Sequence, residues 1–182
     1  MYQWTDAALF DIRQLTLRAD RVRLQGTQDY ELLSPLGNDR LWSSFVATAG
    51  GESLVEVRVL DTSNISATEH RRVLQRLKLL QIVAHPAIRR IVEIAADRQP
   101  PFAVFERPCQ LAADGADHCD AKICHHLFDG LACAHRFGFV AGQISIADVR
   151  IRETNDWLLD LTNDPMQSDP ADVATSTQAS GV

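Results

Sequence analysis

The sequence contains no long apolar run and no excess of positive charge. None of its apolar stretches approaches the roughly 18–20 residues that cross a bilayer. The amino-terminal segment contains Asp6 and Asp11 instead of a basic start followed by an apolar block. With 18 Lys and Arg against 24 Asp and Glu, the net charge is −6, which argues against non-specific binding to nucleic acid or an anionic membrane. We therefore expect a cytoplasmic protein whose partners are neither nucleic acid nor membrane.

Cysteine is scarce as well, and no C-x-x-C pair occurs. The four cysteines are Cys109, Cys119, Cys124 and Cys133. This usage favours free thiols in a reducing compartment. Histidines at 118, 125 and 126 could complete a metal cluster with Cys119 and Cys124, but the spacing matches no familiar zinc pattern. We interpret Cys124 and His125 as one face of a helix and expect no metal there.

The length and composition predict one globular unit, because 182 residues with 46% hydrophobic content can bury one sizeable core. Strands are predicted at 30–36, 42–48, 54–60, 88–94, 102–106, 149–152 and 157–160. A first helix should follow the polar linker 61–68 and stop before His85-Pro86. A second should cover 121–137 and end at Gly138.

The run 54–60 has the clearest pattern in the chain. Val55, Val57 and Val59 alternate with Glu56 and Arg58, which predicts a strand in an antiparallel meander with one buried face. The segment 1–29 suits either a helix or a short strand and is treated as an amino-terminal extension. The segment 165–182 is too polar to bury a core and is predicted to be disordered.

The order of these elements resembles that of a bacterial-type serine/threonine protein kinase over roughly residues 29–164. Tyr30-Glu-Leu-Leu-Ser-Pro-Leu-Gly37 resembles the strand entering the Gly-rich loop, and His85-Pro-Ala-Ile88 resembles the segment after the C-helix. Phe102-Ala-Val-Phe-Glu106 is similar to the strand before the hinge, and Leu127-Phe-Asp-Gly-Leu-Ala-Cys-Ala-His135 to the E-helix.

The resemblance implies an α+β, protein-kinase-like fold. Its amino-terminal lobe, 30–107, would hold a five-stranded antiparallel sheet with the C-helix. Its partial carboxy-terminal lobe, 108–164, would hold a long helix and a β-hairpin. No A-P-E segment or substrate-platform helix follows in the sequence, so the resemblance implies a truncated domain with an uncovered long helix.

The family's Gly-rich loop lets backbone amides approach the nucleotide phosphates. Here Gly37 remains, whereas Asp39 and Trp42 stand at the second and third glycine positions and Ser44 at the valine position. We expect an acidic side chain and a bulky ring to prevent phosphate binding. The segment is interpreted as an ordinary hairpin turn.

The residues that would form the lysine–glutamate ion pair and those that would contact the nucleotide are also replaced. Arg58 stands at the position of the phosphate-binding lysine, and Glu56 at that of the adenine-facing alanine. Arg76 stands at the position of the C-helix glutamate, so the two arginines should repel each other. Arg150 occupies the second adenine wall. The favoured interpretation is that Glu56 and Arg150 turn separately to solvent, and the alternative is that they form a bridge across the empty pocket.

The catalytic loop has lost its base, because Gln143 stands at the position of the catalytic aspartate and an amide cannot accept the proton. Asp148 and the aspartate of Asp160-Leu-Thr162 are weak candidates for a divalent metal site. Pairing of Asp160 with Arg58 is the favoured interpretation. An apolar link between Leu80 and Leu161 is also expected.

These replacements predict a protein without kinase activity, bound ATP or bound Mg²⁺. The function that the resemblance favours is a non-catalytic, pseudokinase-like scaffold that binds another protein or self-associates through its partial carboxy-terminal lobe. The alternatives are a weak or atypical kinase that uses Asp148, Asp160 and Arg58, and a non-functional kinase remnant.

Overall fold

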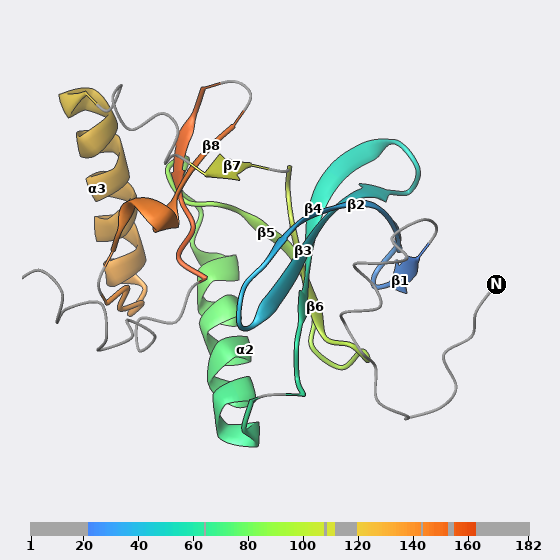
Figure 1. Ribbon diagram of the computed structural model, residues 1–182. Coiled ribbons are helices and arrows are strands. Elements are labelled where there is room, and N and C mark those ends of the chain that lie inside the picture. Colours follow the sequence, from blue (N-terminus) through green and yellow to red (C-terminus); the bar gives the residue numbers. More distant parts are fainter. Residues whose placement is uncertain are drawn as a thin grey trace, which may run out of the picture.

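The computed structural model describes residues 22–63, 65–107, 109–111, 120–142, 144–152 and 155–162. The described elements form an α+β fold with a curled, six-stranded antiparallel sheet, a three-stranded sheet and two α-helices (Figure 1). The strand orders are β1-β2-β3-β4-β6-β5 and β7-β8-β9. The predicted tail 165–182 and most of the segment 1–29 lie outside the described residues.

The strands of the large sheet are β1 (Arg23–Gln25), β2 (Asp29–Asn38), β3 (Trp42–Ala49), β4 (Ser53–Leu60), β5 (Ile91–Ala95) and β6 (Phe102–Phe105). Those of the small sheet are β7 (Gln110–Leu111), β8 (Val149–Ile151) and β9 (Trp157–Leu159). The helical elements are α2 (Ala67–Ile82), α3 (Ala121–Arg136) and the short 3-10 helix η2 (Ile146–Asp148). The predicted strands and helices are therefore present, with small shifts at their ends.

Strand β4 corrects the expectation of one buried face. Val55, Val57 and Val59 are buried as their alternation predicts, but Glu56 and Arg58 on the opposite face are buried too. The reason is that the second face of β4 is covered by other parts of the chain instead of solvent. The charged positions of this strand therefore lie inside the protein.

The prediction of five strands in the large sheet was also incomplete, because β1 pairs with β2 as a sixth strand. The turn between these two strands is fastened to β5 by Glu93. Its carboxylate accepts hydrogen bonds from the backbone N and the hydroxyl of Thr27 and from the hydroxyl of Tyr30, each at 2.6 Å. A Cβ at Gly26 would lie 2.2 Å from a Glu93 oxygen, so a larger residue there would require the Glu93 carboxylate to move. These contacts are far apart in sequence, which explains why local pattern did not reveal β1.

Both long helices begin at capping residues. The hydroxyl of Ser66 accepts a hydrogen bond from the backbone N of Glu69 at 3.1 Å, and the carboxylate of Asp120 accepts one from Ile123 at 2.8 Å. Helix α2 ends before His85-Pro86 and α3 ends before Gly138, which has a positive φ of 78°, so both predicted stops are confirmed.

Gly130 lets α3 approach the segment that follows α2. A Cβ at this position would lie 2.9 Å from the Cβ of Ala87, closer than two carbon atoms can pack. Helix α3 therefore lies against residues 85–88, on the side of the molecule away from β1 (Figure 1). No helix in the described ranges is long and apolar enough to cross a membrane.

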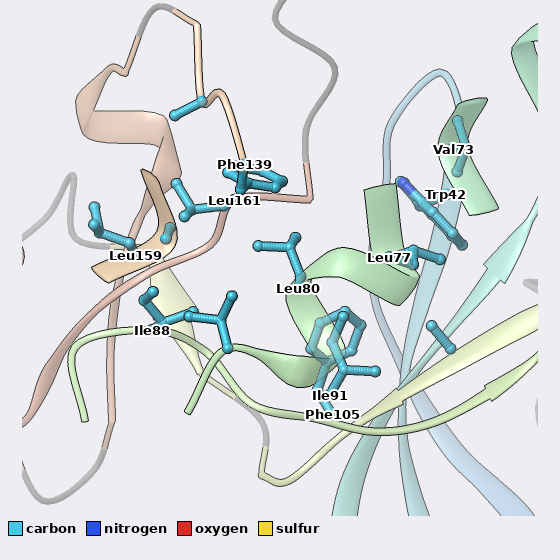
Figure 2. Close-up of a cluster of buried hydrophobic side chains, with 14 of the residues drawn as sticks. Trp42, Val73, Leu77, Leu80, Ile88, Ile91, Phe105, Phe139, Leu159 and Leu161 are labelled. Carbon is cyan, nitrogen blue, oxygen red and sulfur yellow. The ribbon is translucent and has the colours of Figure 1, made fainter. Parts of the chain in front are cut away.

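Two groups of buried apolar side chains form the core. One lies on the face of the large sheet that carries Phe45, Val57 and Val104. The other connects the opposite face to α2, α3 and β9, and includes Leu80 and Leu161. Figure 2 shows Leu80 pointing toward Leu161 and Phe139. The apolar link expected between the C-helix position and the residue after Asp160 is thus part of this core.

Truncation of Leu161 to alanine tests this link. We expect Leu161→Ala to lower the free energy of unfolding by about 2–4 kcal/mol, because Leu161 is buried among apolar side chains. Chemical denaturation measures this loss. Leu54→Ala is the matched control, because Leu54 is 53% exposed and should cost far less. Equal losses for both variants would contradict the burial of Leu161.

Candidate functional site

Asp160 is the centre of a buried cluster of charged residues. It follows strand β9 and is 0% exposed. Its Oδ2 atom accepts hydrogen bonds from Arg58 Nη2 at 2.5 Å, Arg89 Nη1 at 3.1 Å and Arg150 Nε at 3.2 Å. Its Oδ1 atom accepts one from the hydroxyl of Thr162 at 2.5 Å. Three guanidinium groups from three separate segments therefore meet at one carboxylate.

Glu56 supplies the second buried carboxylate of this cluster. Its Oε1 atom accepts hydrogen bonds from Arg58 Nε at 2.8 Å and Arg89 Nη1 at 3.0 Å, and Arg89 Nη2 lies 2.5 Å from Oε2. The guanidinium carbons of Arg58 and Arg89 lie 4.9 and 4.3 Å from the centre of the Phe105 ring, a favourable cation–π arrangement. Glu56, Arg58, Arg89 and Asp160 thus form one connected ion-pair network.

The network determines the protonation states of its members. Burial by itself raises the pKa of Asp160, but Arg58, Arg89 and Arg150 outweigh this effect and hold that pKa well below its ordinary value of 3.8. Burial by itself also raises the pKa of Glu56, but the attraction of Arg89 and Arg58 outweighs this effect and lowers that pKa below 4.5. The pKa of Arg58 is raised, because the attraction of Asp160 and Glu56 outweighs its desolvation. Both carboxylates are therefore ionised at neutral pH.

All hydrogen-bonding nitrogens of the Arg58 side chain are occupied. Nε donates to Glu56, Nη2 donates to Asp160, and Nη1 donates to the hydroxyl of Thr162 at 2.8 Å. The pair of Arg58 with Asp160 that the sequence favoured over a metal site is present. Arg58 therefore acts as a buried structural cation in this arrangement.

Neither alternative for Glu56 and Arg150 is present, because the two side chains form no direct bridge and Glu56 is buried instead of turned to solvent. Glu56 pairs with Arg58 and Arg89, and Arg150 pairs with Asp160. The reason is that Arg89, which carries no recognisable motif, lies between the two walls and provides the cation that Glu56 needs. Glu56 and Arg150 belong to one network, but they are connected only through the other members.

Arg76 does not face Arg58 in a repulsive pair. From α2 it donates Nε to the backbone oxygen of Leu161 at 3.0 Å and Nη1 to that of Val140 at 3.1 Å. Its guanidinium carbon lies 4.2 Å from the centre of the Phe139 ring. Each arginine has its own acceptors, and Arg76 connects α2 to the segments that precede β8 and follow β9.

The residues of the expected loop form a hairpin turn between β2 and β3. Asp39 does not point toward a ligand, because its Oδ1 accepts hydrogen bonds from the backbone N of Leu41 at 2.8 Å and of Trp42 at 2.7 Å. Trp42 is buried near Val73 and Leu77 (Figure 2), so its ring does not block the turn as expected. Gly37 lies in β2 with a φ of 154°.

The candidate metal ligands are used in other ways. Asp148 accepts hydrogen bonds from the backbone N of Ser145 at 2.8 Å and from its hydroxyl at 3.1 Å, which closes the turn of η2. Within the described ranges, no group of three or more His, Cys, Asp or Glu side chains is arranged to hold a metal ion. Gln143, His118 and Cys119 lie outside the described residues.

A second ion pair lies at the edge of the network. Arg152, which follows β8, donates Nη2 to Glu106 after β6. Exposed Arg90 also lies near Glu106, with 4.0 Å between its Nη1 and a carboxylate oxygen. Arg89, Thr162 and this pair were missed at the level of sequence. The only available signal was the Arg89-Arg90 dipeptide interrupting an apolar run.

The chain was also compared with known proteins. Neither a comparison with models of protein families nor one with curated protein sequences gave a match. The geometry of the buried network is therefore the main guide to function.

Acid should weaken the fold through this network. A carboxylate whose pKa is lowered on folding stabilises the protein above its unfolded pKa, and this contribution is lost as the pH falls toward the folded pKa. Because the pKa values of Asp160 and Glu56 are lowered from 3.8 and 4.5, we expect the free energy of unfolding to fall as the pH drops below about 4.5. Urea titrations at a series of pH values measure this slope.

Glu56→Gln should make that slope shallower by removing one ionised carboxylate. Glu52→Gln is the control, because exposed Glu52 lies on the turn between β3 and β4, outside the network. An identical acid slope for the wild type and Glu56→Gln would show that Glu56 is not ionised in the folded protein.

Proposed function

We propose that this chain is a non-catalytic, protein-kinase-like module that acts by binding another protein. The order of its strands and helices supports a likeness to the amino-terminal lobe of a kinase followed by part of the carboxy-terminal lobe. The observation that carries the proposal is the complete engagement of Arg58 with Glu56, Thr162 and Asp160. Each nitrogen of the residue at the lysine position therefore already donates to a buried partner, and its side chain is only 5% exposed, so a phosphate would have to displace these partners to reach it.

The same network argues against a purine in this pocket. A purine needs an apolar wall where Glu56 stands, but the Glu56 carboxylate is buried and ionised between Arg58 and Arg89. Displacing either arginine would leave a buried charge unpaired, which typically costs several kcal/mol. Asp160 is bound in the same way by three arginines. It can bind a metal ion only if these pairs break.

The surface around α3 supports a protein partner. Four large apolar side chains from α3 and the segment that follows it are exposed: Phe128 at 69%, Phe137 at 47%, Val140 at 74% and Ile146 at 47%. Large apolar side chains left exposed are typical of interaction surfaces when they lie together, and these four come from one stretch of the chain. The proposed module therefore uses its interior for stability and this surface for binding.

Thermal unfolding in the presence of nucleotide tests the catalytic part of the proposal. We expect adenosine to leave Tm unchanged, and ATP with Mg²⁺ to raise Tm no more than tripolyphosphate with Mg²⁺ does. The reason is that a ligand raises Tm only when it binds the folded state, and no apolar wall receives the base. A clear increase with adenosine, or calorimetry that gives micromolar affinity for ATP but not for tripolyphosphate, would contradict the proposal.

Crosslinking in the native cell tests the protein-binding part. We expect Phe128→Ser to abolish a crosslinked species that the wild type forms, without a change in Tm, because Phe128 is largely exposed. Leu54→Ser is the matched control, since exposed Leu54 lies on β4, away from α3. Loss of the species in both variants, or in neither, would show that the surface around α3 does not bind the partner.

A further inference from the structure

Within the part of the chain that the structure describes, the buried network and its edge contain more cations than anions. Four guanidinium groups, those of Arg58, Arg89, Arg150 and Arg152, are paired with three carboxylates, those of Glu56, Glu106 and Asp160. Exposed Arg90 adds a further positive charge beside Glu106. The buried members balance one another, two arginines against two carboxylates, so the surplus positive charge lies with the partly exposed Arg150 and Arg152, where a bound anion would reduce it.

Hydrogen bonding shows the same shortage of acceptors. The buried Nε atoms of Arg89 and Arg152 have no hydrogen-bond partner among the described residues. The Arg89 side chain is only 2% exposed, so water has little access to its Nε. Arg150 uses only its Nε, which donates to Asp160, and its two Nη atoms make no hydrogen bond with the described residues. Among the described residues, the carboxylate oxygens are therefore too few for the donors that surround them.

The unused donors gather on one side of the network. Arg150 lies in β8 and Arg152 follows it, where the hairpin pairing continues through a hydrogen bond from the backbone N of Arg152 to the backbone oxygen of Asp156 at 3.0 Å. Two residues apart in extended chain, the two side chains are expected on the same face of the hairpin. Their side chains are 15% and 24% exposed, respectively, whereas those of Glu56, Arg58, Arg89 and Asp160 are almost completely buried. The network therefore opens to solvent at this pair of arginines, next to Glu106.

We propose that Arg150 and Arg152 form a binding site for a small oxyanion, of which inorganic phosphate is the simplest representative. A guanidinium group presents a planar fork of N–H donors that matches the oxygens of a phosphate. The Nη atoms of Arg150 and the second side of the Arg152 fork provide such donors. The pairs of Arg150 with Asp160 and of Arg152 with Glu106 hold the two side chains in place before the anion arrives.

Glu106 does not occupy all the donors of this site. Its carboxylate is shared between Arg152 and Arg90, and it leaves the Nε of Arg152 without an acceptor. The site is also separate from the question of a purine, since it needs only an anion and no apolar wall. The inference therefore goes beyond the proposed function. The adenosine measurement, which involves no anion, can fail or succeed independently of it.

Titration with inorganic phosphate tests the inference. We expect phosphate to raise Tm of the wild type more than sodium chloride at the same ionic strength, and isothermal calorimetry to give a saturable curve. In Arg152→Gln we expect Kd to increase about tenfold or more, because a charge-assisted hydrogen bond is lost. Arg23→Gln is the matched control and should bind as the wild type does, since Arg23 is a 66% exposed arginine on β1.

The variant Arg152→Lys separates a loss of phosphate binding from a loss of folding. It keeps a cation beside Glu106 but lacks the planar fork, so it should fold and still bind phosphate more weakly than the wild type. Equal effects of phosphate and chloride on the wild type would overturn the inference. Phosphate affinity that is unchanged in Arg152→Lys, or reduced as strongly in Arg23→Gln, would also overturn it, because binding would then depend on overall charge.

Discussion

The carboxylate of Asp160 is the point on which the arrangement of the whole chain depends. It is completely buried, yet ionised, and it has this state only because Arg58 from β4, Arg89 before β5 and Arg150 from β8 all donate to it. Each arginine comes from a different segment, so one charge fixes the position of the small sheet against the large one. Removing a single partner would leave an uncompensated charge in the interior. This explains how a face of β4 that carries charged residues can be covered at all.

Much of the fold could be predicted from the sequence, because local signals determine its elements. The alternation of Val55, Val57 and Val59 identified β4, and the His85-Pro86 and Gly138 signals identified the ends of α2 and α3. Strand β1 was not found, since its place depends on the contact of its turn with Glu93, 66 residues away from Thr27. The burial of Glu56 and Arg58 was also missed. Alternation shows that a strand has two faces, but it does not show what covers the second one.

The candidate site was predictable only in part. The resemblance to a kinase identified Arg58 and Asp160 as neighbours, and their pair is present. It gave no role to Arg89, because nothing in a short charged dipeptide indicates that one arginine turns inward and the next turns outward. As a result the only partner considered for Glu56 was Arg150, the cation at the opposite adenine wall. Trp42 was misjudged for a related reason. A replacement at a glycine position indicates what is lost, but not where the new side chain packs.

Strand β4, the residues before β5 and the β8–β9 hairpin meet at Asp160 although long stretches of sequence separate them, and this affects how the chain reaches its native state. A partly folded chain that has formed the large sheet but not the β8–β9 hairpin would already bring Glu56, Arg58 and Arg89 together without Asp160. Such a species would enclose two guanidinium groups with one carboxylate and would gain little by excluding water. Removing these guanidinium groups from water becomes favourable only when the carboxylate of Asp160 is also in place. The charges therefore disfavour intermediates, and native pairings of high sequence separation form together in one cooperative step.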